Sequence, residues 1–449
     1  MKKQTYGISV LLASGLLLAA CSGEEENAAQ NNDGTDSGEE ENMNDMNEEE
    51  NMDDMNEEEN MNMEEEMNEN DEEMNMEGSR SEFEENFAEL PESFNEGAEE
   101  GLQTMNTKNV TRLEGDNPEH FSITASQTIW PATHEHNQPG AVILADPAEW
   151  EKALAALSLV HHPNDGPLLL LEEGLSEEIL AEIERLSPKG NEEGVEILAA
   201  LDLSDEDREQ LEGYEVDEIT EDEPAAFAKE VEDRFAETIG ERPENVLIGT
   251  MNEEHKIASI TAGSWISHMN ESILYVDDEV PEPTREALEE REGSANIYVM
   301  GGESAVSEEV VEELREYGEV QRIGGDGPVQ HSIDFASYED DHFGWGIDEP
   351  GHGLVFASPD EPELALAGAP LAHLGKHAPM IWIENDELEE AHGEYLARLK
   401  PAFEEAPMEG PYNHGYILGG EEIISFQTQG IIDDKMEIQP LDGGGHDEH

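Results

Sequence analysis

The sequence predicts an α/β protein of three tandem units with parallel sheets, preceded by a long disordered acidic segment. Two observations indicate this fold class. Apolar runs of strand length alternate with segments of helical periodicity, which is typical of parallel sheets that helices cover on both faces. In addition, "TRLEGDNPEHFSITAS" at 111–126 returns as "QRIGGDGPVQHSIDFAS" at 321–337, and this separation of 210 residues fits two periods of about 105 residues.

The first twenty residues have the layout of a secretory signal. Lys2 and Lys3 precede an apolar run that is too short to span a bilayer comfortably. The run ends in "LAAC" at Cys21, which resembles the lipobox of bacterial lipoproteins, where the cysteine thiol receives a diacylglyceryl group before cleavage. The resemblance implies lipidation at Cys21, the only cysteine of the chain, and an anchor on the outer face of the cell membrane.

From Ser22 onwards the composition changes to Glu, Asp, Asn and Met. Residues 22–100 hold 33 acidic side chains and one arginine, and "NMNDMNEEE" is followed directly by "NMDDMNEEE". Such a segment cannot bury enough apolar surface to offset the entropy lost on ordering it. We expect a self-repelling, disordered tether over 21–109 that carries the folded part from the membrane into the cell wall.

The folded part is acidic as well. Residues 101–449 carry 80 acidic and 18 basic side chains, a net charge near −62. This charge argues against nucleic acid or an anionic membrane surface as a partner, and in dilute buffer it destabilises a compact state. At molar salt the Debye length falls to about 3 Å, which screens the repulsion. We therefore expect a halophilic organism.

Each unit is expected to run strand, helix, strand, helix, strand. In the first unit the strands are expected at 141–147, 166–173 and 194–200, and the helices at 150–160 and 176–186. The same order returns in the second and third units. "VDEITEDEP" at 216–224 is a worn middle copy of the repeated motif, with Ile219 where Leu113 and Ile323 stand. Three equal units favour packing as a pseudo-trimer about a pseudo-threefold axis.

The unit resembles the type 2 cell-wall-binding repeat family. The resemblance rests on the Arg-hydrophobic-x-Gly-Asp stretches at Arg112 and Arg322, on "GPLLLL" and "APMIWI", and on "YVMGGESAVS" at 298–307 and "YILGGEEIIS" at 416–425. Members typically carry three Toprim-like or Rossmann-like repeats, packed as a pseudo-trimer, that attach proteins non-covalently to anionic wall polymers of Gram-positive bacteria. The resemblance implies a cell-wall polymer as partner. We expect no cofactor, no bound metal and no catalysis.

The chain departs from the family pattern in ways that affect binding. The first unit has Ala199-Ala200 where the later units have Gly-Gly, and the usual Arg-Tyr-x-Thr-Ala continuation is missing after both arginine motifs. Fewer cationic groups weaken direct capture of an anionic polymer, because phosphate and carboxylate recognition depends on bidentate arginine. A divalent cation that bridges two acidic surfaces would restore the attraction.

The candidate ligand-binding residues belong to loops that follow expected strands, where backbone amides can cradle an anionic group. The set comprises Gly301, Gly302, Glu303, Gly419, Gly420, Glu421, Arg112 and Arg322. A sharp turn from strand to helix also requires glycine. Asp277-Asp278 comes nearest to the acidic pair of a Toprim catalytic site, but its spacing is not repeated in the other units, so an enzyme is not expected.

Histidines occur close together at His134 and His136, at His161-His162, and in the tail at 446–449. His373 and His377 stand four apart, which on a helix places both on one face. Surface histidines without a ligand are the preferred interpretation. Zinc or nickel binding is the alternative.

The predicted organisation is a signal peptide at 1–20, the tether at 21–109, repeats at 110–213, 214–318 and 319–438, and a flexible tail at 439–449. Three functions stay open. The preferred one is a lipid-anchored, non-catalytic wall-binding protein. The first alternative is an extracytoplasmic receptor for a metal ion or small ligand, bound in clefts at the strand ends. The second alternative is a metal-dependent hydrolase.

Overall fold

The computed structural model describes residues 79–441, apart from 96, 162, 326, 375 and 376. The predictions for the signal peptide, for Cys21, for the acidic repeats up to residue 78 and for the tail beyond 441 lie outside the described residues. In the described part no helix has the length and apolar character that crossing a membrane requires.

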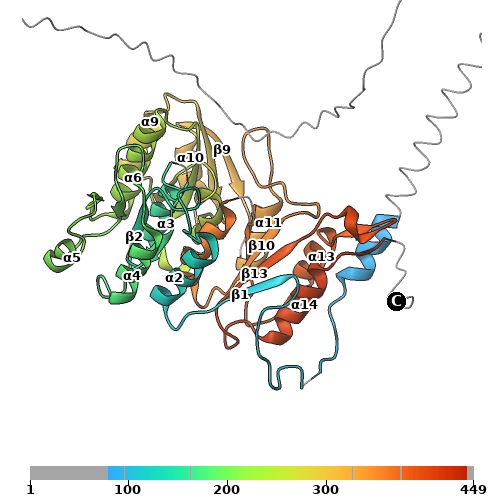
Figure 1. Ribbon diagram of the computed structural model, residues 1–449. Helices are drawn as coiled ribbons and strands as arrows, with labels where there is room; N and C mark the ends of the chain where they lie inside the picture. The colour runs from blue at the N-terminus through green and yellow to red at the C-terminus, as the bar shows by residue number, and fades with distance from the viewer. Residues whose placement is uncertain (1–78, 96, 162, 326, 375–376, 442–449) are drawn as a thin grey trace, which may run out of the picture. The chain divides into compact units, whose positions relative to one another are not determined.

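The described chain is a mixed α/β protein whose sheets are all parallel, which confirms the predicted fold class (Figure 1). The first sheet contains β2 (Val142–Ala145), β3 (Leu168–Leu170), β4 (Ile197–Ala199) and β5 (Val216–Glu218). The second contains β6 (Asn245–Thr250), β7 (Ile273–Val276), β8 (Ala295–Met300) and β9 (Gly318–Ile323). The third contains β1 (Val110–Leu113), β10 (Gly353–Ala357), β11 (Met380–Trp382) and β13 (His414–Leu418), and a small fourth sheet pairs β12 (Ala402–Phe403) with β14 (Gln439–Pro440).

Helices connect the strands. Those of the first two sheets are α2 (Pro118–Ile129), α3 (Trp150–Ala156), η1 (Leu157–Leu159), α4 (Glu177–Leu186), α5 (Asp205–Gln210), α6 (Pro224–Ile239), η2 (Glu253–His255), α7 (Lys256–Ile260), α8 (Gly263–Ile266), α9 (Glu282–Glu289) and α10 (Glu308–Leu314). Those that follow are α11 (Pro328–Ser337), α12 (Pro362–Gly368), η3 (Ala369–Ala372), α13 (Glu390–Arg398), η4 (Pro407–Glu409) and α14 (Phe426–Met436).

The three four-stranded sheets share one strand order. The orders are β3-β2-β4-β5, β7-β6-β8-β9 and β11-β10-β13-β1. In the third sheet the outer position belongs to the N-terminal strand β1, whose Arg112 is in register with Ile417 of β13. Figure 1 shows the cyan β1 beside β13, although some 300 residues separate them. The first strand of the described chain therefore completes the last sheet.

The predicted repeat boundaries follow the sequence period, whereas the sheets cross them. The strand β5 lies within the predicted repeat 214–318 but pairs with β4 in the first sheet, whose other strands belong to the predicted repeat 110–213. The strand β9 spans the predicted boundary at 318/319 and pairs with β8. The reason is that each copy of the repeated motif forms the outer strand of one sheet, while the helix directly after this strand packs on the next sheet.

The helix after each outer strand packs on the next sheet. Helix α2 packs on β3, α6 on β7, and α11 on β11. Serine side chains fix two of these contacts, because Ser122 Oγ accepts a hydrogen bond from Leu170 N at 3.1 Å and Ser332 Oγ accepts one from Trp382 N at 3.1 Å. Ala228 occupies the equivalent place in α6. The helix that follows the outer strand of each sheet therefore packs on another sheet, and the three contacts form a closed cycle.

The central strands carry the core. All residues of β2 and β10 are buried, because helices cover both faces of a parallel sheet. The expected second helix of the first unit is confirmed as α4, and Ser176 caps it by accepting a hydrogen bond from Ile179 N at 3.0 Å. The expected strands and helices of this unit are found with ends shifted by a few residues.

The last part of the predicted tether is structured, so the prediction of disorder over 21–109 is wrong there. Residues 79–88 are helical, and Phe83 and Phe87, four residues apart, place their rings 4.6 Å apart on one face. Arg80 Nη1 donates to the carbonyl oxygen of Lys400 at 3.0 Å, and Lys435 Nζ donates to that of Glu89 at 2.9 Å. These contacts attach the segment to the region around α13 and α14.

Candidate ligand-binding site at the carboxyl edge of the second sheet

The predicted glycines form the turns that follow β8 and β13. Gly301 and Gly419 have φ angles of 90° and 104°, in the left-handed region that glycine adopts without penalty. A Cβ atom on Gly301 would lie 2.8 Å from the Cβ of Ala258, and one on Gly419 would lie 2.7 Å from Cδ1 of Ile423. Turn geometry and close packing therefore both require glycine at these positions.

The two predicted arginines fix these glycine turns. Arg322 Nη1 donates to the carbonyl oxygens of Gly301 at 2.9 Å and Gly302 at 3.0 Å, and its Nη2 donates to Val306 O at 2.8 Å. Arg112 Nη1 donates to Gly419 O at 2.9 Å. The structure thus brings the predicted residues together in two separate groups, one at the second sheet and one at the third.

The guanidinium donors are largely used inside the protein. Arg112 is 6% exposed, and its Nε also donates to Oε1 of Gln429 at 2.8 Å. Burial lowers the pKa of Arg112, and the nearby carboxylates of Glu114 and Glu421 oppose this shift. Contact of either arginine with a ligand stays a prediction, and their observed contacts are those of residues that hold a loop in place.

The predicted carboxylates Glu303 and Glu421 are exposed beside the turns. A hydrogen bond with Glu421 raises the pKa of Glu99, so the segment before β1 reaches the edge of the third sheet. Gly420 is partly exposed next to Glu421. The corresponding edge of the second sheet carries a hollow.

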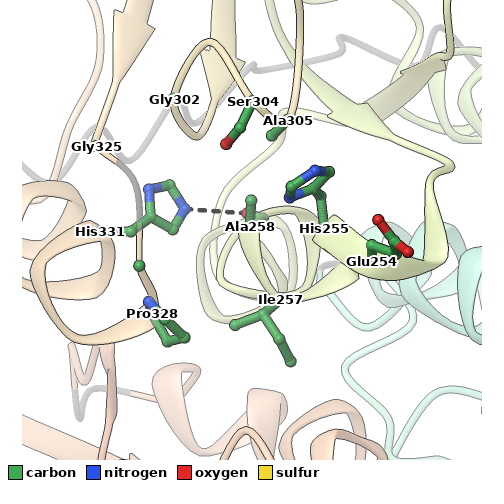
Figure 2. A pocket seen from close by; sticks show the side chains of 11 residues that line it. Glu254, His255, Ile257, Ala258, Gly302, Ser304, Ala305, Gly325, Pro328 and His331 are labelled. Atoms are coloured by element: carbon green, nitrogen blue, oxygen red, sulfur yellow. Dashed lines mark hydrogen bonds between the residues drawn. The ribbon is translucent and has the colours of Figure 1, made fainter.

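The hollow of about 250 Å³ lies between the loops that follow β6, β8 and β9 (Figure 2). Along the chain β6 is followed by β7 on one side of the sheet, and β8 then pairs on its other side. The hollow therefore lies at the switch point, where open parallel sheets bind ligands. Its walls include Glu254, His255, Ala258, Gly302, Ser304 and His331.

His331 forms the deepest polar part of this wall. Its Nε2 donates to Ala258 O at 3.1 Å, the dashed line in Figure 2, because a carbonyl oxygen can only accept. Burial lowers the pKa of His331, so the ring is neutral at pH 7. Its Nδ1 has no hydrogen-bond partner among the described residues, and a Cβ atom on Gly324, where φ is 78°, would lie 1.9 Å from it.

The sequence interpretation missed His331, although a comparison of the copies contains the signal. The equivalent residues of α2 and α6 are Phe121 and Phe227, both fully buried. A histidine in a place that is otherwise phenylalanine is a buried polar group that needs an explanation.

The start of α11 faces the hollow through Pro328. Gly327 is its N-cap and supplies no side-chain hydrogen bond, whereas Asn117 caps α2 by accepting from His120 N at 2.8 Å. An uncapped helix start offers backbone N–H donors to a ligand, while Glu254 on the opposite wall opposes a full negative charge. The arrangement suits a small ligand with hydrogen-bond acceptors.

The outer strand of the first sheet, β5, carries a glutamate where the outer strands of the other two sheets carry an arginine. Ile219 aligns with Leu113 and Ile323, so Glu218 aligns with Arg112 and Arg322. Arg208 of α5 donates to it from Nε at 2.9 Å and from Nη2 at 2.6 Å. This contact lowers the pKa of Glu218. Ala199-Ala200 replaces the two glycines here, as the sequence shows.

Two solved structures share this fold. Cwp6 from Clostridium difficile aligns with a TM-score of 0.58 at 15% identity, over 71% of this chain and 47% of its own. Cwp8 from the same organism aligns with a TM-score of 0.58 at 19% identity, over 73% of this chain and 52% of its own. The chain therefore spans about half the length of each, and at these identities the likeness is one of fold alone.

No protein-family profile matches the chain, and no curated protein sequence matches it. The resemblance to the type 2 cell-wall-binding repeats therefore rests on the quoted motifs.

Proposed function

We propose that this protein is a non-catalytic component of the cell envelope that binds a cell-wall polymer non-covalently through three α/β repeats. The observation that supports this most is the fold likeness to the cell wall proteins Cwp6 and Cwp8. The cyclic connection of three sheets with one strand order adds to it, since it is the arrangement that the family resemblance implies.

The attachment to the cell is proposed to use Cys21 and the acidic tether. The lipobox-like "LAAC" supplies the acyl anchor, and the acidic segment spaces the folded part from the membrane into the wall. The protein would then connect the outer face of the membrane with the wall of a salt-adapted Gram-positive bacterium.

Cation bridging is the proposed mode of binding. The folded part carries a net charge near −62, and Arg112 and Arg322 use their donors on backbone carbonyls. Direct capture of a polyanion is therefore weak, whereas a divalent cation can join two acidic surfaces. Concentrated salt screens the remaining repulsion.

Sedimentation with purified Gram-positive walls tests the proposal. The chain from residue 22 onwards is mixed with walls in 2 M NaCl, with calcium or with EDTA, and the bound fraction is measured. We expect binding with calcium, release by EDTA, and loss of binding to walls stripped of their anionic polymers. Equal sedimentation with intact and stripped walls would contradict the proposal.

A second candidate function is that of a receptor for a small ligand. The hollow at the switch point of the second sheet favours it, because parallel sheets place ligand sites there. Uncharged fragments of wall polymer with hydrogen-bond acceptors, such as short sugar chains, are expected to raise the unfolding temperature of the isolated protein if this function holds. Wall binding without any such rise would favour the first proposal.

A further inference from the structure

Five histidines from different parts of the chain gather in one cluster, and none of them lines the hollow. His161 follows η1, His268 follows α8, His373 follows η3, and His352 and His377 precede β10 and β11. The ring centroids are 5.2 Å apart for His161 and His373, 6.3 Å for His268 and His373, 5.1 Å for His268 and His377, and 5.4 Å for His352 and His377. The cluster joins residues that adjoin all three large sheets.

Within the cluster two ring nitrogens face each other. Nδ1 of His352 and Nδ1 of His377 are 3.4 Å apart. Two nitrogens bound to one tetrahedral ion at about 2.0–2.1 Å lie about 3.4 Å apart, as the tetrahedral angle requires. A hydrogen bond from one ring to the other gives a similar N–N distance. The distance therefore fits both a hydrogen-bonded pair without metal and a pair bound to one ion, and metal addition distinguishes the two.

We propose that His352 and His377 form a chelating pair for a borderline transition-metal dication such as Zn²⁺, Ni²⁺ or Cu²⁺, with water completing the coordination. Among the described residues no group of three or more His, Cys, Asp or Glu side chains is arranged to hold a metal ion. The site is therefore a two-histidine site. It goes beyond wall binding and does not depend on it.

Backbone strain marks the same place. His377 has a φ of 48°, a left-handed conformation that is uncommon outside glycine and that often accompanies functional sites. The preceding helix ends at Ala372, and His373 is extended, so the prediction that His373 and His377 share a helix face is wrong. Pro370 within η3 lacks the N–H donor that a continuing helix needs. The turn, instead of a helix, directs His377 towards His352.

The surroundings of the pair suit metal binding. Both rings are partly buried, and a metal ion binds neutral imidazole through the lone pair of a ring nitrogen. The high negative charge of the chain raises the local concentration of dications. Imidazole ligands select transition metals over calcium, so this site is distinct from the proposed cation bridge.

A tryptophan beside the pair provides the reporter. The ring centroid of Trp345 is 5.0 Å from that of His377, and Trp345 stacks on His268 at 5.5 Å with an interplanar angle of 7°. Cu²⁺ and Ni²⁺ quench the fluorescence of a tryptophan at contact distance, whereas closed-shell Zn²⁺ does not. Because the chain has 16 histidines, a signal specific to this location is needed.

The test titrates the full chain with Cu²⁺ and follows tryptophan fluorescence, with Zn²⁺ as a competitor. We expect saturable quenching by one equivalent of Cu²⁺, reversed by a large excess of Zn²⁺, because Cu²⁺ binds imidazole more tightly. His352→Asn and His377→Asn are each expected to raise the quenching midpoint about tenfold or more, because one of two chelating ligands is lost. Trp345→Phe is expected to remove most of the quenching, while calorimetry still detects the ion.

The matched control is His134→Asn with His136→Asn. These two rings are also close, with centroids 5.9 Å apart, but His136 is exposed and both are remote in sequence from the pair. The control is expected to leave the quenching midpoint unchanged. Far-UV circular dichroism and the unfolding temperature confirm that each variant is folded. The proposal is overturned if His352→Asn and His377→Asn, both folded, quench with the wild-type midpoint, or if the wild type shows no saturable quenching.

Discussion

The outer strands β9 and β5 occupy the same place in two sheets and differ in charge. Arg322 of β9 fixes the turn after β8 by donating to three carbonyl oxygens. Glu218 of β5 instead accepts hydrogen bonds from Arg208 of α5. In both sheets the residue links the outer strand to the segment that follows the neighbouring strand. Arg322 does so as a donor to carbonyl oxygens and Glu218 as an acceptor from Arg208. The comparison teaches that a carboxylate can take the place of the repeated arginine when the neighbouring segment supplies the donor.

The same two edges differ in their glycines. Gly301 adopts a left-handed conformation that leaves the carbonyl oxygens accessible to Arg322. In the first sheet Ala199-Ala200 occupies this place, and alanine disfavours such a turn. The hollow with His331 is found at the glycine-containing edge of the second sheet. Substitutions of the loop glycine, the arginines and the histidine test which of these features distinguishes that edge.

The largest effect is expected at Gly324. Gly324→Ala places a Cβ atom 1.9 Å from Nδ1 of His331 at a φ of 78°, so both packing and backbone are strained. We expect the free energy of unfolding to fall by about 3 kcal/mol. Urea denaturation followed by circular dichroism measures the change.

Gly325→Ala is the matched control for this prediction. No atom lies within 4 Å of a Cβ added at Gly325, so its free energy of unfolding should stay within about 0.5 kcal/mol of the wild type. Equal losses for the two substitutions would mean that loop flexibility, not the contact with His331, determines the effect.

Arg112→Met is expected to have the next largest effect. It leaves the buried carbonyl of Gly419 and the side chain of Gln429 without their partner, which costs about 2–2.5 kcal/mol. Arg322→Met should cost about 1–2 kcal/mol, because the side chain is 23% exposed and water can replace some of its hydrogen bonds. The urea midpoints of both variants rank the two losses of stability. A larger loss for Arg322→Met than for Arg112→Met would contradict the inference that deeper burial makes the hydrogen bonds of Arg112 the stronger contribution.

The pH dependence of His331 comes third. The pKa of this ring is lowered by burial, so below its unfolded value of about 6.5 the unfolded state binds more protons and the folded state loses stability as the pH falls. His331→Phe, which copies Phe121 and Phe227, removes this loss. Relative to the wild type the variant should gain at most about 1.4 kcal/mol per pH unit below pH 6.5.

Urea unfolding at several values between pH 8 and pH 5 measures this difference. Asp334, Glu254 and His255 lie near the ring, but they are present in both proteins and cancel in the comparison. The converse change Phe121→His should introduce the same sensitivity to acid in α2. Parallel stability curves for the wild type and His331→Phe would show that the ring does not titrate as its burial implies.

Much of the fold could be predicted because it depends on local patterns. Continuous apolar runs such as "VILA" in β2 and "GLVFA" in β10 indicate strands that are buried on both faces. The closure of the third sheet by β1 could not be predicted in this way, because nothing near Arg112 in sequence indicates a partner 300 residues away. The predicted tether also ended too late, since Phe83 and Phe87 are too few to mark a helix in so acidic a context.

The candidate site was predicted in part for the same reason. The glycine turns and arginines were identified as a set, but their internal hydrogen bonds depend on the packing of β13 against β1 and of β8 against β9. His331 and the pair His352 and His377 depend on side chains brought together from distant segments. Single-sequence patterns contain no measure of such distances.

The smallest effect is expected for Arg208→Met. Arg208 and Glu218 pair at the surface, where side chains are 46% and 23% exposed, and such pairs add little to stability because water and salt screen them. The urea midpoint should change less than for either Arg112→Met or Arg322→Met, and the difference from wild type should shrink between 0.1 and 1 M NaCl. Arg112→Met should keep its effect at both salt concentrations, because it loses buried hydrogen bonds instead of a screened charge pair. If Arg208→Met were as damaging as Arg112→Met, the charge-reversed edge of the first sheet would be as essential as the arginine-based edges, and the two arrangements would be equivalent in strength as well as in place.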